Sequence, residues 1–157
     1  MSPRAIALGA AALLGAASAC SASNSACFRT CPALAGQWLV AFEPATDPSE
    51  CRQIRVTVQD GVLVIAQQTS ALSAIFDGQE LSGTAYDTGQ FTLDGLFAPD
   101  AGGLGDAFSF RGTFTPSRDG GAGGDALAGT YDATLRRPGP QGTLTCRLLR
   151  SYAAARR

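Results

Sequence analysis

Apolar and polar residues alternate over most of the chain after residue 35, and this two-residue period predicts β-strands with one buried face. In the segment 36–42, GQWLVAF, residues Trp38, Val40 and Phe42 share one face. The segment 51–68, CRQIRVTVQDGVLVIAQQ, predicts two strands joined by a hairpin turn at Asp60-Gly61. Asp-Gly favours such a turn because it readily adopts the positive φ that the turn requires.

Three later segments resemble one another, because each contains Gly-Thr followed within two positions by an aromatic residue. They are residues 81–87, 110–116 and 127–135, and strands are also predicted over 89–97 and 143–152. About eight strands are predicted in all, with no amphipathic helix to cover their apolar faces. We therefore expect an all-β fold, a single antiparallel up-and-down meander barrel, because closure hides the apolar face and removes the sheet edges. A two-sheet β-sandwich is the alternative, since it has the same strand pattern.

The start of the chain has the order of residues found in a secretory signal peptide. Arg4 is followed by an uncharged apolar run over residues 5–17, and Cys20 follows three small residues, Ala17-Ser18-Ala19. As a helix, this run would reach only about 20 Å, which is short of the ~30 Å hydrocarbon core of a bilayer. The sequence therefore predicts a cleaved signal peptide and no membrane-spanning helix.

The stretch ASAC, residues 17–20, resembles a bacterial lipobox, whose cysteine becomes the lipidated first residue of the mature protein. The resemblance implies lipidation of Cys20 and sorting to the outer membrane, because Ser21 rather than aspartate follows the cysteine. The alternative is cleavage by the general signal peptidase, which would leave a periplasmic or secreted soluble protein. The expected domains are a signal peptide over 1–19, a lipidated N-terminus and tether over 20–33, a β-barrel over 34–153 and a basic tail over 154–157.

Lipidation of Cys20 would leave an even number of cysteines, as disulfides in an exported protein require. We favour the pairs Cys27–Cys31 and Cys51–Cys146, because the last strand of a closed meander neighbours the first. Loop-closure entropy does not choose between these pairs and the pairing of Cys31 with Cys51 and Cys27 with Cys146. A zinc site on the four thiols is disfavoured, since the chain has no C-x-x-C spacing and is expected to be exported.

Gly36-Gln37-Trp38, at the head of the first predicted strand, resembles the G-x-W motif of the lipocalins. In that family the tryptophan closes one end of a barrel, and an arginine from the last strand region stacks on it. The resemblance implies a lipocalin-like barrel in which Arg147 or Arg150 stacks on Trp38. The segment LAGQW, residues 34–38, with its downstream cysteine is also similar to small periplasmic metalloprotease inhibitors. Those inhibitors are eight-stranded barrels that insert an N-terminal segment into the protease cleft.

The residues that would support catalysis are missing from the sequence, so we expect neither an enzyme nor a cofactor. The chain has no histidine and no G-x-S-x-G, phosphate loop or cofactor fingerprint. Its 12 basic residues nearly balance its 13 acidic residues, which argues against nucleic-acid binding. The segment GGAGGDALA, residues 120–128, matches a nine-residue calcium-binding repeat, but such repeats bind calcium only when stacked, so a glycine-rich hairpin loop is expected.

The apolar faces of the predicted strands suggest a function in binding, because a small barrel can hold one ligand. We expect the mouth of the barrel to accept a small apolar or amphipathic molecule, lined by Trp38, Phe108, Phe110, Phe114 and Tyr131. The same side chains could instead fill the barrel, and the alternative function is a protein–protein interaction module of the cell envelope, such as a protease inhibitor. A cavity on the order of a few hundred Å³ would favour a ligand, and a filled core with an exposed apolar patch would favour a protein partner.

Overall fold

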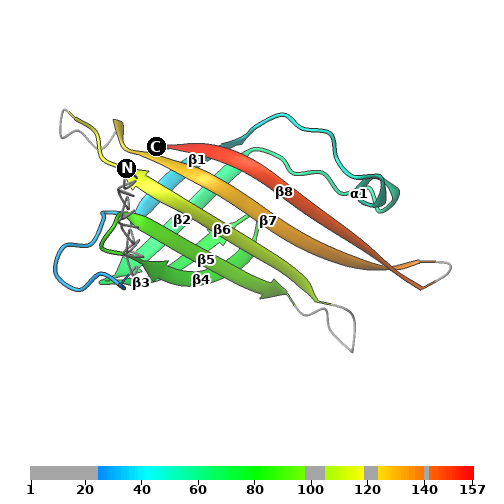
Figure 1. Ribbon diagram of the computed structural model, residues 1–157, viewed down its shortest axis with the longest axis horizontal. Helices are drawn as coiled ribbons and strands as arrows, with labels where there is room; N and C mark the ends of the chain where they lie inside the picture. The colour runs from blue at the N-terminus through cyan, green and yellow to red at the C-terminus, as the bar shows by residue number, and fades with distance from the viewer. Residues whose placement is uncertain (1–24, 98–104, 119–123, 140–141) are drawn as a thin grey trace, which may run out of the picture.

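Eight antiparallel strands close into one barrel in the computed structural model, which describes residues 25–97, 105–118, 124–139 and 142–157. Each strand pairs with the next along the chain, and β8 pairs with β1 to complete the cylinder (Figure 1). The up-and-down barrel is thus confirmed, and the sandwich is excluded. The strands are β1 (Gly36–Phe42), β2 (Gly61–Gln68), β3 (Ala71–Phe76), β4 (Gln79–Ala85), β5 (Gln90–Phe97), β6 (Asp106–Thr115), β7 (Ala126–Gly139) and β8 (Gly142–Arg156).

The prediction of a strand over residues 51–59 is wrong. Ser49–Gln53 forms the short helix α1, and the chain from Ile54 to Asp60 pairs with no strand. The barrel still has eight strands because Ala71–Phe76 forms β3, which was not predicted. Pro48 at the N-cap and Glu50 in the first turn are residues typical of a helix start.

The Asp-Gly hairpin turn occurs at Asp77-Gly78 and not at Asp60-Gly61. Asp77 has φ 49° and Gly78 has φ 74°, and they join Phe76 of β3 to its partner Gln79 of β4. Positive φ at both central residues is the requirement of a type I′ turn, the tightest connection between antiparallel strands. Asp60 instead accepts a hydrogen bond from the backbone N–H of Phe42 at 2.9 Å, so its carboxylate fixes the end of β1.

The two longest strands, β7 and β8, extend past the other strands at the end of the barrel where α1 lies (Figure 1). α1 packs against β8, and Cys51 of the helix is bonded to Cys146 of the strand. At its other end β8 continues to Arg156, so residues 154–156, expected in a solvated tail, belong to the barrel wall. No helix in the described ranges combines the length and apolar character needed to cross a membrane.

The repeated Gly-Thr pairs mark places where neighbouring strands approach too closely for a side chain. A Cβ added at Gly83 would lie 1.7 Å from the carbonyl oxygen of Thr92, and one added at Gly129 would lie 1.9 Å from that of Arg111. The atoms in the way belong to the backbone of the neighbouring strand and cannot move aside, so only glycine fits at these two positions.

A cluster of five aromatic rings packs inside the barrel. Tyr131 is central to it, with ring centroids 4.7 Å from Phe110 and 5.3 Å from Phe42. Phe76 and Tyr152 complete the cluster through edge-on contacts with Phe110. These rings form part of the packed core, and three of them, Phe76, Phe110 and Tyr131, also face a cavity at one end of the barrel.

Candidate binding cavity

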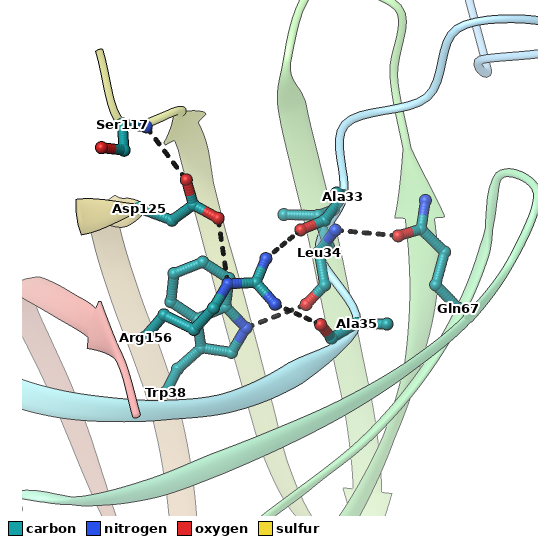
Figure 2. Close-up of polar contacts among 8 residues, drawn as sticks. All are labelled: Ala33, Leu34, Ala35, Trp38, Gln67, Ser117, Asp125 and Arg156. Atoms are coloured by element: carbon teal, nitrogen blue, oxygen red, sulfur yellow. Dashed lines mark hydrogen bonds and ion pairs between the residues drawn. The ribbon is translucent and has the colours of Figure 1, made fainter. Parts of the chain in front are cut away.

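One end of the barrel is closed around Trp38, whose side chain is fully buried. The indole Nε1 donates a hydrogen bond to the carbonyl oxygen of Leu34 at 2.9 Å, and the guanidinium carbon of Arg156 lies 4.5 Å from the ring centroid (Figure 2). This distance is within the range of a cation–π interaction. The arginine expected to stack here was Arg147 or Arg150, and that expectation is wrong.

The pairing of β1 with β8 explains why Arg156 and not another arginine meets the tryptophan. Trp38 is directly opposite Arg156 in this register. Arg147 points outward, where it forms an ion pair with Asp132. Arg150 points inward but is nearer the other end of β8, where it pairs with Asp47.

Backbone carbonyls and one carboxylate hold Arg156 in place. Its Nε donates to Asp125 at 3.0 Å, and both side chains are only 14% exposed. Its two terminal nitrogens donate to the carbonyl oxygens of Ala33 and Ala35 (Figure 2). The backbone N–H of Leu34 donates to the Gln67 side chain at 2.9 Å, so residues 33–35 are bonded across this end on both sides.

The segment before β1 covers the same end of the barrel. The Cys27–Cys31 disulfide closes a small loop, Cys27 is 2% exposed, and its backbone N–H donates to the carbonyl oxygen of Ala85 at 3.0 Å. Ala26 forms a bridge with Tyr86. Residues 25–33, expected to belong to a tether, are therefore bonded to the barrel.

The opposite end contains a cavity of about 230 Å³. Its walls include Phe76, Phe108, Phe110 and Tyr131, with Leu135 and Leu148 from the extended hairpin. Residues 56–59 of the connection between β1 and β2 lie across its mouth. The cavity therefore has aromatic and aliphatic walls on the side of the aromatic cluster, polar and charged side chains on its other sides, and a border made by a segment outside the sheet.

Three charged side chains line the cavity, and two of them neutralise each other. Both carboxylate oxygens of Asp106 accept from Nη1 of Arg137 at 2.8 Å, and Oδ1 also accepts from the backbone N–H of Arg136 at 2.9 Å. The third charge, Asp77, lies at the β3–β4 turn. Burial, with a smaller contribution from the charge of Asp77, raises the pKa of Tyr131 above its ordinary value. The phenol is therefore neutral at physiological pH and keeps its hydroxyl proton.

Several separated attachments hold the β1–β2 connection, residues 43–60, over the cavity. Cys51 is bonded to Cys146, Arg150 contacts both Asp47 and the carbonyl oxygen of Ala45, and the backbone N–H of Glu43 donates to Ser151. At the other end of the connection, Asp60 accepts from the backbone of Phe42. Between Cys51 and Asp60, the side chains of Ile54, Val56 and Val58 are partly buried and pack against the core. The connection is thus fixed at a few points rather than along a hydrogen-bonded ladder.

The structure separates the five aromatic residues predicted to line a binding site. Phe108, Phe110 and Tyr131 line the cavity, as expected. Trp38 and Phe114 instead contact each other at the closed end, with ring centroids 6.2 Å apart. Phe76 was not expected in the lining because β3 was not predicted, and residues 56–59 were not expected there because they were predicted to form a strand.

The cysteines and the glycine-rich segment have structural partners that bear on the metal alternatives. The disulfides are the favoured pairs, so these four sulfurs are bonded to one another and do not form the zinc site considered above. Asp125 of the calcium-like repeat pairs with Arg156 and accepts from the backbone of Ser117. Residues 120–123 of that repeat, and Cys20 with its signal peptide, lie outside the described residues.

Comparisons of the chain with protein-family models, with curated proteins and with solved structures find no match. A function must therefore be inferred from the structure itself. The relevant features are the cavity at one end, the closure around Trp38 at the other, and the charged residues at the cavity.

Proposed function

We propose that this chain is an exported protein of the cell envelope, lipidated at Cys20, whose lipocalin-like barrel binds a small amphipathic molecule in the cavity beside α1. The cavity carries this proposal, because it lies among inward-facing residues of the barrel at the end opposite to the one closed around Trp38. An apolar cavity of about 150 Å³ can hold benzene. The larger space of about 230 Å³ suits a ligand with one ring and a short chain.

The distribution of aromatic residues supports a binding site of limited depth. Phe110 and Tyr131 line the cavity and Trp38 does not, so a ligand there would contact these two rings without reaching Trp38. The lining combines Phe, Leu and Val side chains with polar groups, which are the Asp106–Arg137 pair, Thr57, Gln59, Asp77 and Gln79. Apolar walls with a few placed polar groups are typical of small-molecule sites.

Occlusion of the cavity tests this function. Leu135 lines the cavity and is 7% exposed, so Leu135→Trp should fill the space. The matched control is Leu149→Trp on β8, because Leu149 is 59% exposed and points outward. Native mass spectrometry of protein purified from its source should show a bound small molecule in the wild type and the control, and none in Leu135→Trp. Absence of any bound molecule from the wild type would contradict the proposal.

Export and lipidation are supported by the signal-like N-terminus and by two disulfides, which persist in oxidising compartments. Intact-mass analysis of the protein from bacterial cells should show a mature chain that begins at lipidated Cys20. Cys20→Ser should lose the lipid and release the protein from the membrane fraction. A cytosolic product that retains residues 1–19 would refute export.

A second candidate function, a protein–protein module, is favoured by an apolar outer surface. Leu39, Val62, Val64 and Ile75 are exposed on the adjacent strands β1, β2 and β3. Contiguous exposed apolar residues are common at protein interfaces. Inhibition by an inserted N-terminal segment is less well supported, because residues 25–35 are bonded to the barrel. Val64→Ser with Ile75→Ser should abolish crosslinking to an envelope protein in intact cells if this function is correct.

A further inference from the structure

The charges around the cavity do not balance. Asp106 and Arg137 neutralise each other through two contacts of 2.8 Å. Asp77 has no ion-pair partner among the described residues, which leaves one negative charge at the cavity border. The adjoining surface depression adds Arg55 and Asp60, whose charges are opposite and leave this excess unchanged.

The walls next to this charge are aromatic. The ring of Phe76 lies 5.0 Å from that of Phe110 and 6.1 Å from that of Tyr131, measured between centroids, and all three line the cavity. The face of an aromatic ring attracts a cation placed within about 6 Å of its centroid. Rings and an unpaired carboxylate therefore favour the same kind of ligand group.

A polar group at the cavity also lacks a partner. Tyr131 is only 5% exposed as a residue, but its hydroxyl oxygen remains accessible from the cavity and no protein group is hydrogen-bonded to it among the described residues. Asp77 is close enough for its charge to act on this hydroxyl. Because the hydroxyl oxygen is accessible and accepts hydrogen bonds, a ligand in the cavity that donates to it would be stabilised there.

We propose that the cavity selects an organic cation, in which an ammonium group on a short chain or aromatic body lies between Asp77, the Tyr131 hydroxyl and the ring of Phe76. The inference rests on the proposed binding function and names its ligand class. The ammonium donates to the carboxylate and to the hydroxyl, and its apolar body occupies the space beside Phe108 and Phe110. A carboxylate ligand is disfavoured, because Asp77 repels it and Arg137 is already bonded to Asp106.

Three probes with the same phenyl ring and different polar groups test the ligand class. They are 2-phenylethylammonium, 2-phenylethanol and 3-phenylpropanoate, each titrated calorimetrically into the disulfide-bonded protein at low ionic strength. We expect the ammonium to bind about tenfold more tightly than the alcohol, a difference of about 1.4 kcal/mol, and the carboxylate to bind most weakly. Equal affinities, or tightest binding of the carboxylate, would overturn the cation inference but leave the binding function standing. Failure of all three probes to bind at millimolar concentration would overturn both.

Two variants of equal charge locate the effect. Asp77→Asn should reduce the affinity for the ammonium about tenfold and leave the affinity for the alcohol within about twofold. Asp87→Asn removes the same charge from the β4–β5 turn near the closed end, where the Asp87 backbone bonds to Ser25, and should change neither affinity. Tyr131→Phe, which keeps the ring, should weaken ammonium binding about threefold. Equal losses from Asp77→Asn and Asp87→Asn would show a general charge effect and would refute recognition by Asp77.

Discussion

The two ends of the barrel are covered by different physical means. At the closed end, residues 33–35 are bonded on both sides, and Trp38 is enclosed by Arg156 and Leu34. At the other end, the β1–β2 connection is held by one disulfide, by the contacts of Arg150 with Asp47 and Ala45, and by hydrogen bonds near its two ends. A cavity lies beneath it. A dense set of hydrogen bonds and ring contacts excludes ligand, whereas a few separated attachments leave space under the covering segment.

This difference in attachment predicts a difference in local stability. Segments with few backbone hydrogen bonds and few buried side chains open more easily than the rest of a fold. The half-buried residues Ile54, Val56 and Val58 satisfy this description, and the fully buried Leu34 and Trp38 do not. Ligand entry is therefore expected through movement of the β1–β2 connection.

Removal of the disulfides should give the largest difference between the ends. Cys51 and Cys146 are 95 residues apart and Cys27 and Cys31 only 4. Loop-closure entropy is then worth about 4–5 kcal/mol for the longer loop and about 2 kcal/mol for the shorter one. Urea unfolding should therefore show a greater loss of stability in Cys51→Ser with Cys146→Ser than in Cys27→Ser with Cys31→Ser. A greater loss of stability from removal of Cys27–Cys31 would contradict the view that Cys51–Cys146 is the main attachment of the β1–β2 connection.

Truncation of one aromatic residue at each end should give the next largest difference. Trp38→Ala removes a fully buried ring, so we expect it to lower the free energy of unfolding by about 3–5 kcal/mol. Phe108 is only partly buried, and Phe108→Ala should cost less than half as much. Only Phe108→Ala should alter the affinity for the phenyl probes, because Phe108 lines the cavity and Trp38 does not. Chemical denaturation and calorimetry on the same samples measure both effects.

Replacement of one aspartate at each end compares the two arginine attachments. Asp125→Asn weakens the partner of Arg156 and should lower stability by about 1–2 kcal/mol without changing the rate of probe release. Asp47→Asn weakens the partner of Arg150 and should accelerate probe release and amide hydrogen exchange over residues 49–58. Stopped-flow dissociation and hydrogen-exchange mass spectrometry measure these effects. Faster release in Asp125→Asn than in Asp47→Asn would place the entry route at the wrong end.

The barrel was predictable from the sequence because inward apolar residues alternate with outward residues along most of its strands. The same alternation misled over residues 54–59, where positions 54, 56 and 58 are half-buried and 55, 57 and 59 are exposed. A segment that lies across the end of a barrel also buries every second side chain, so alternation shows one-sided burial and not strand pairing. In β3 the apolar residues Ala71 and Ile75 point outward, and they weaken the sequence alternation of the inward residues Leu72, Ala74 and Phe76.

The site was only partly predictable, because register decides which inward residues meet. Trp38, Phe110 and Tyr131 all point inward, but strand pairing places the first at the closed end and the other two at the cavity. Arg156 was missed for the same reason, since the length of β8 cannot be obtained from alternation in the run Ala153-Ala154-Ala155. The favoured cysteine pairs were correct, although Cys51 reaches Cys146 from a helix and not from a strand.

The smallest expected effect comes from an ion pair that belongs to neither end. Asp132 and Arg147 lie on the outer wall, and the hydrogen bonds from Arg147 hold the pKa of Asp132 below its usual range. A carboxyl group with a lowered pKa in the folded state stabilises the fold above its unfolded pKa of about 3.9, and this contribution is lost as the pH falls through the folded pKa. The pair is exposed to solvent, so its contribution is expected to be small and to decrease with added salt.

Asp132→Asn should therefore unfold slightly more easily than the wild type near pH 6 and indistinguishably from it near pH 3. At both pH values, Asp132→Asn should bind 2-phenylethanol as tightly as the wild type does, because Asp132 and Arg147 do not line the cavity. Urea titrations at the two pH values, repeated in high salt, provide the measurement. A loss of stability in Asp132→Asn as large as that in Asp125→Asn would mean that the outer wall contributes as much as the closed end, and the contrast between a densely bonded end and the rest of the barrel would fail.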